Sequence, residues 1–101
     1  MKIIHRFEGE TIIIKVPEEL DHKVATDIKI IADNAVYSGQ VRNIQFDFKG
    51  TRFMDSSGIG MITGRYKLVH PLGGKIYVCD VGENVERIIT LSGLHKLVER
   101  K

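Results

Sequence analysis

Strand-like and helix-like segments alternate along this chain, and this order limits the folds open to it more than any other feature. The strand-like segments span residues 2–16, 41–48 and 75–81, and the helical ones residues 21–39, 56–70 and 83–100. The first segment holds two β-rich runs separated by residues 8–10, a hairpin signal because Gly9 can take positive φ in a turn. The last is interrupted at residues 92–93, before a predicted short terminal helix that carries Leu94, Leu97 and Val98.

The order ββαβαβα predicts one mixed sheet with helices packed on it. Two β-α-β units imply parallel strands joined by right-handed crossovers, and the opening hairpin adds an antiparallel strand. The loops over residues 17–21 and 49–57 should therefore emerge at the same carboxyl edge of the sheet, where open α/β sheets place their binding sites. Asp21, His22 and residues 55–57 become candidates for one shared surface.

Apolar residues mark the faces that these elements should bury. In residues 21–39 they recur at helical spacing, as Val24, Ile28, Ile31, Ala35 and Val36. Asp21 is predicted to cap this helix and residues 38–39 to end it. In residues 41–48, by contrast, the alternation of Ile44, Phe46 and Phe48 with polar residues predicts a strand.

The composition suits one globular domain, which we expect to span residues 1–101. Lys and Arg number 15 against 13 Asp and Glu, interspersed along the chain, unlike the clustered basic footprint of a nucleic-acid-binding protein. No apolar run approaches the ~20 residues that cross a bilayer, and no signal-peptide core opens the chain. The single cysteine, Cys79, excludes an internal disulfide. We expect a cytoplasmic protein that binds neither nucleic acid nor membrane.

The stretch FMDSSGIG, residues 53–60, lies between a predicted strand and a predicted helix. It could hold a nucleophile, a phosphate cradle, a phosphorylation site or only a helix start. A nucleophile elbow needs G-x-S-x-G and an oriented base, but no glycine lies two residues before Ser56 or Ser57, and nothing independent nominates His22 as the base. The P-loop pattern is absent, and the glycines fall inside the helix rather than before it. A hydrolase is disfavoured, and nucleotide binding through this stretch is weakly supported.

Helix initiation explains part of the stretch. Asp55 or Ser56 can cap the helix, because a short oxygen-bearing side chain accepts from the unpaired amides of the first turn. Gly60 and Gly64 each cost about 1 kcal/mol relative to Ala inside a helix, and their spacing puts them on one face. Either that face packs tightly, or an external partner approaches it closely.

A serine exposed in this first turn could also accept a phosphate. The helix dipole and free amides would stabilise the phosphate, so the fold would tolerate it. A partner docked there would not, because about two negative charges would need desolvation beside Asp55. Such a modification would change binding without changing the fold. From physical chemistry alone it remains one alternative among those above.

The same stretch, continuing to GRYK at residues 64–67, resembles the phosphorylation-site segment of anti-sigma factor antagonists of the STAS family, nearest to the sporulation type of Gram-positive spore formers. The resemblance extends to ELDH at residues 19–22, LGGKIYVC at 72–79 and LSGLHKLV at 91–98, and so covers essentially the whole chain. It implies an α/β STAS fold, with a mixed sheet of four to five strands, an N-terminal antiparallel hairpin and about four helices.

The resemblance also implies a binding switch that is not an enzyme and uses no cofactor. The unphosphorylated form would bind an anti-sigma factor that is also an ATP-dependent serine kinase, and so release the sigma factor. The kinase would then phosphorylate Ser57 and dissolve the complex, and a PP2C-type phosphatase would restore the active form. Asp55, Ser56 and Gly58 would shape the phosphosite loop. The kinase-binding surface would include Asp21, His22, Gly60 and Gly64.

Some positions depart from the family pattern. Glu18 replaces a glycine and adds negative charge near the implied interface, and residues 82–83 are Gly-Glu where Ser-Pro is common. The alternative function is a STAS scaffold or nucleotide-sensing subunit of a larger signalling assembly. No metal site is predicted, because no metal-ligand spacing relates Cys79 to the histidines or the histidines to one another: His5, His22, His70 and His95.

Overall fold

The predicted hairpin and β-α-β units form one five-stranded sheet in the structure, a computed structural model that describes residues 2–101. In sheet order the strands are β1 (His5–Glu8), β2 (Thr11–Lys15), β4 (Asn43–Asp47), β6 (Ile76–Cys79) and β7 (Val98–Arg100). β1 pairs antiparallel with β2, and the other neighbouring strands pair parallel. The α/β fold with its N-terminal antiparallel hairpin is therefore confirmed.

A second, two-stranded sheet was not predicted. β3 (Glu19–Leu20) pairs in parallel with β5 (Phe53–Met54), so that Leu20 lies opposite Met54. Each strand has only two residues, too few to show the alternation by which a strand is predicted. This short pairing ties together the two loops that carry the candidate surface.

Three α-helices and two 3₁₀ turns occur in residues 2–101, in line with the expectation of about four helices. The helices are α1 (His22–Tyr37), α2 (Ser56–Val69) and α3 (Glu83–Ser92), and the 3₁₀ turns are η1 (His70–Leu72) and η2 (Leu94–Lys96). The predicted terminal helix is η2 followed by β7, which begins at Val98. Gly93 ends α3 with a left-handed φ of 84°, and Val98 then pairs with Ile76 at the sheet edge.

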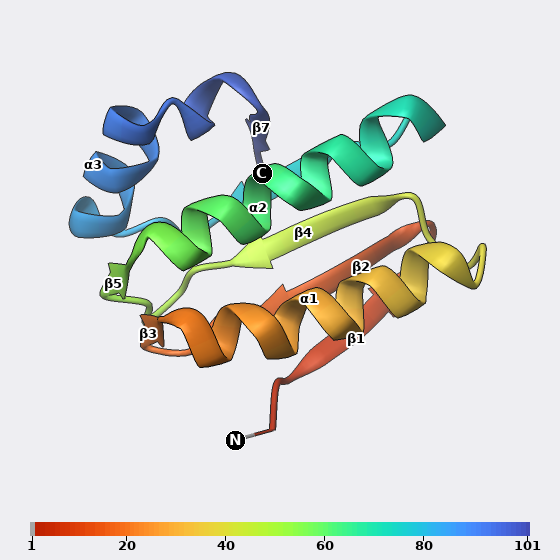
Figure 1. The fold of residues 1–101 in the computed structure, drawn as a ribbon, viewed down its shortest axis with the longest axis horizontal. Helices are drawn as coiled ribbons and strands as arrows, with labels where there is room; N and C mark the ends of the chain where they lie inside the picture. The colour runs from red at the N-terminus through yellow and green to blue at the C-terminus, as the bar shows by residue number, and fades with distance from the viewer. Residues whose placement is uncertain (1) are drawn as a thin grey trace.

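The helices α1 and α2 lie side by side over one face of the five-stranded sheet, and α3 lies near β5 (Figure 1). The apolar core fills the space between the helices and the sheet. Its largest fully buried side chains include Ile12, Ile14, Ile28, Phe46 and Ile62. Ile13 lies outside this core cluster, in register between Arg6 and Gln45. Within residues 2–101, no helix is long and apolar enough to cross a membrane.

Candidate functional site

The two long helices begin next to each other because the strands that precede them are paired. Asp21 caps α1, and its carboxylate accepts from the Val24 amide at 3.0 Å. Asp55 caps α2 with almost the same backbone geometry: φ and ψ are −95° and −174°, against −95° and −173° at Asp21. The predicted cap at Asp21 is confirmed, and of the two predicted caps for α2 the structure selects Asp55. The two loops do meet at one edge.

His22 and Ser57 touch across the start of the two helices. The distance from His22 Nδ1 to Ser57 Oγ is 3.2 Å, a hydrogen bond whose donor depends on the histidine tautomer. Ser57 is half-buried, whereas its neighbour Ser56 is exposed. Ser57 is therefore less exposed than expected for a serine in the first turn of a helix, although it does not cap α2. Sequence reasoning had no independent reason to pair these two residues, which are 35 positions apart.

The backbone amides at the start of α2 are already occupied. Asp55 Oδ1 accepts from the Ser57 amide at 2.8 Å and from the Gly58 amide at 3.2 Å. From the sequence, we expected free amides of this turn to stabilise a phosphate on the serine. In the unmodified protein these two amides are not free, because the cap carboxylate binds both.

Gly58 lets α2 start in close contact with the small sheet. A Cβ at this position would lie 2.6 Å from Met54 Cγ and 2.8 Å from Leu20 Cγ, both in fully buried side chains. Side-chain carbons cannot approach so closely, so the residue sets how near the α2 start comes to β3 and β5. Gly58 thus shapes the loop that presents Ser57.

We expect Gly58→Ala to lower the free energy of unfolding by about 1–3 kcal/mol, because the added methyl group overpacks a filled site. Urea denaturation of the variant and the parent measures this difference. Gly60→Ala is the matched control, since a Cβ there meets nothing within 4 Å. Equal stability of Gly58→Ala and the parent would contradict the tight packing at the start of α2.

A shallow groove of about 350 Å³ runs from the His22–Ser57 contact along α1 and α2. Its lining includes His22, Thr26, Lys29, Ser57, Gly60 and Arg65. Gly60 is exposed within it, and Gly64 also has open space at its Cβ position but does not line the groove. The two glycines therefore are not explained by tight internal packing.

A buried ion pair joins the two helices at the far end of this groove. Arg65 Nε lies 3.0 Å from Asp33 Oδ1, and the two side chains are only 9% and 14% exposed. The contact is an ion pair without an aligned hydrogen bond, since neither Arg65 Nε nor Asp33 Oδ1 has a hydrogen-bond partner among the described residues. Lys29 Nζ also pairs with Asp33, at 3.1 Å. Sequence reasoning missed this network, because a lone arginine inside a helix does not reveal its partner on another helix.

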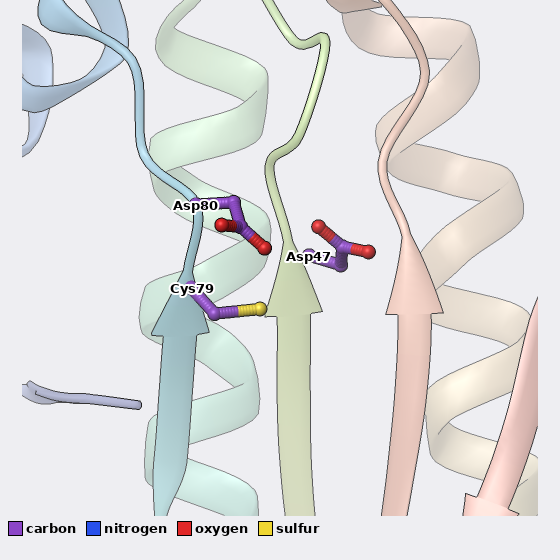
Figure 2. Close-up of side chains that lie close together, drawn as sticks. All are labelled: Asp47, Cys79 and Asp80. Carbon is purple, nitrogen blue, oxygen red and sulfur yellow. The ribbon is translucent and has the colours of Figure 1, made fainter.

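Asp47, Cys79 and Asp80 gather at the carboxyl ends of β4 and β6, with the helices behind the strands in Figure 2. One ligand atom from each lies within 4.8 Å of the others. Burial raises the pKa of the Cys79 thiol, and the nearby carboxylates of Asp47 and Asp80 raise it further, against a hydrogen bond from Gln45 that lowers it. None of the four histidines belongs to this cluster.

Comparison with known proteins gives consistent matches over nearly the whole chain. A family model described as the STAS domain matches residues 2–101. An anti-sigma F factor antagonist of Paenibacillus polymyxa is 40% identical over 87 residues, which are 86% of this chain and 74% of that protein. A protein of the same description from Lysinibacillus sphaericus is 31% identical over 85 residues, 84% of this chain and 73% of that protein.

Two solved structures with the same fold represent two states of one regulator. The anti-sigma factor antagonist SpoIIAA in its unphosphorylated form has a TM-score of 0.78 at 25% identity, covering 89% of this chain and 83% of that chain. The Bacillus cell fate determinant SpoIIAA in the phosphorylated form has a TM-score of 0.80 at 26% identity, covering 99% and 91%. The fold thus matches both forms about equally well.

Proposed function

This chain belongs to the STAS domain family, and we propose that it acts there as an anti-sigma factor antagonist that phosphorylation of Ser57 switches off. Relatives that are 40% and 31% identical are described as anti-sigma F factor antagonists. The observation that carries the proposal is the place of Ser57: half-buried at the start of α2, beside the Asp55 carboxylate and opposite His22.

Phosphorylation at this point acts through the interface rather than through the fold. The phosphate would add about 1.5 to 2 negative charges next to Asp55. A partner covering the paired helix starts would have to remove water from that charge, which is costly. SpoIIAA, whose structure has been solved in both forms, matches this chain closely in each. The unphosphorylated form is therefore the binding form in our proposal.

The binding surface in this proposal consists of the paired helix starts and the groove behind them. Asp21, His22 and Gly60 lie there together, and Gly64 lies one turn after Gly60 on α2. Asp55, Ser56 and Gly58 shape the loop that presents the serine. The open space at the Cβ positions of Gly60 and Gly64 lets a partner backbone come close to α2.

The partners that we propose are an anti-sigma factor with ATP-dependent serine kinase activity and a PP2C-type phosphatase that removes the phosphate. The chain itself supplies a protein substrate and a docking surface, not a catalyst. Residues 1–101 form a single STAS domain in this proposal, supported by the family match over residues 2–101 and by one continuous apolar core.

Incubation with the cognate anti-sigma factor and Mg-ATP tests the proposal. Mass spectrometry should locate one phosphate, on Ser57, in the parent and in Ser56→Ala, and none in Ser57→Ala. Phosphate on Ser56, or none on the parent, would contradict it. A persistent assembly much larger than a heterotetramer on size-exclusion chromatography would favour the scaffold alternative instead.

We expect Gly60→Ala to raise the stability of the protein and to weaken its binding to the partner. Its Cβ meets open space, and Ala is favoured over Gly inside a helix, so the free energy of unfolding should rise by up to about 1 kcal/mol. If a partner backbone packs on this face, the same methyl group should weaken binding several-fold. Urea denaturation and isothermal titration calorimetry measure the two effects. A stabilised variant with unchanged affinity would remove Gly60 from the interface.

A further inference from the structure

The contact between His22 and Ser57 gives a phosphate on Ser57 a partner inside the same chain. The phosphate would be bonded to Ser57 Oγ, which lies 3.2 Å from His22 Nδ1. The amides of Ser57 and Gly58 already donate to Asp55. Among the described residues, the side chain within hydrogen-bonding distance of Ser57 Oγ is His22.

We propose that His22 is a positioning residue for the Ser57 switch, which fixes the hydroxyl before phosphorylation and pairs with the phosphate afterwards. The pairing with the phosphate rests on the proposed function, but only because it takes Ser57 as the phosphorylated residue. In the unmodified chain the imidazole holds Oγ in one orientation, whichever of the two groups donates. After phosphorylation the ring donates to a phosphate oxygen, and a hydrogen bond to this charged acceptor is stronger than a neutral one.

The other charged groups near His22 are either negative or already paired, so the imidazole is the group expected to bind the phosphate. The carboxylates of Asp21 on α1 and Asp55 on α2 repel a phosphate, and both are engaged as helix caps. Three cations on these two helices are already paired: Lys23 with Asp27, and Lys29 and Arg65 with Asp33. Glu19 of β3 precedes the α1 cap and adds negative charge. His22 is thus the side chain among the described residues that touches the phosphorylated atom and can donate to a phosphate.

The pairing would keep the phosphate folded over the start of α1 rather than extended into solvent. The phosphorylated surface then differs from the unmodified one at the α1 start as well as at Ser57. A partner that covers both helix starts meets a hydrogen-bonded phosphate that it would have to release or bury. His22 in this view acts on the switch from within the chain, in addition to any contact with a partner.

A phosphoserine installed at position 57 during translation tests this without a kinase. The ³¹P NMR titration of the phosphate should have its midpoint lower in the parent than in His22→Ala, by about half a pH unit or more, because a hydrogen bond donated to the dianion favours that form. Lys23→Ala is the matched control, since it removes a full positive charge one residue away. Its midpoint should move much less than that of His22→Ala.

A second readout follows the histidine ring directly. In long-range ¹H–¹⁵N spectra the His22 Nδ1 resonance should shift when phosphoserine replaces Ser57, and much less when it replaces the exposed Ser56. Equal phosphate midpoints in the parent and His22→Ala would overturn the inference. So would a His22 Nδ1 shift that is the same for phosphoserine at position 57 and at position 56. A kinase that fails to modify Ser57 would contradict the proposed function and leave these titrations unaffected.

Discussion

Ser57→Asp is expected to weaken the affinity for the anti-sigma factor by about 100-fold or more. Removing one partner of a buried interface charge pair costs about 2–5 kcal/mol, mostly because a charge is left buried and unpaired. A carboxylate at position 57 produces the same situation, since Asp55 already lies beside it and any partner must cover both. Isothermal titration calorimetry with the purified anti-sigma factor measures the loss.

Two control variants show whether the loss of affinity comes from a charge at position 57. Ser56→Asp places the same charge on the exposed neighbour, and we expect a markedly smaller loss because water can still reach it. Ser57→Ala removes the hydroxyl without adding charge and should bind within a few-fold of the parent. An affinity of Ser57→Asp within about threefold of the parent would contradict the electrostatic account of the switch.

Asp33→Ala is expected to lower the free energy of unfolding by about 3 kcal/mol. The substitution leaves Arg65, whose side chain is 9% exposed, as a buried cation without its partner, and such losses typically cost about 3–5 kcal/mol. Lys29 also loses its partner but is more exposed and can turn to water. Urea denaturation of variant and parent gives the difference.

The double variant Asp33→Ala/Arg65→Met removes both charges, and most of the lost stability should return. Asp27→Ala is the surface control, because its pair with Lys23 is an i,i+4 contact between more exposed side chains and should matter by less than about 0.5 kcal/mol. A loss in Asp33→Ala no larger than in Asp27→Ala would show that the pair does not hold α1 against α2.

The features that could be predicted from the sequence are those with a local signal. The hairpin follows from β-rich runs around Gly9, and the caps of α1 and α2 follow from an aspartate directly before each of these two helices. The shared edge of the two loops followed from topology alone, because parallel strands end on the same side of a sheet. These predictions were confirmed.

The features that were missed depend on partners distant in the sequence. β3 and β5 are too short to show a period, and neither His22 nor Arg65 carries a sign of the residue it meets on the other helix. The predicted break at residues 92–93 is where α3 ends, but the terminal helix is only the 3₁₀ turn η2, because the β-branched Val98 begins the edge strand β7. Packing against the β6 edge decided the outcome there.

The exposure of Ser57 was also misjudged, and the correction matters for function. A first-turn serine is usually open to water, but the pairing of β3 with β5 brings α1 close enough to cover it partly. The serine is therefore hydrogen-bonded to His22 before any partner arrives, between the starts of two capped helices.

The most direct test of the switch is the lifetime of the preformed complex with the anti-sigma factor after ATP is added. Dissociation can be followed by fluorescence anisotropy while phosphate incorporation is measured in the same samples. The parent complex should dissociate as phosphate appears on Ser57, and the Ser57→Ala complex should persist. A Ser57→Ala complex that dissociates at the parent rate, or a parent complex that persists with Ser57 fully phosphorylated, would contradict the account.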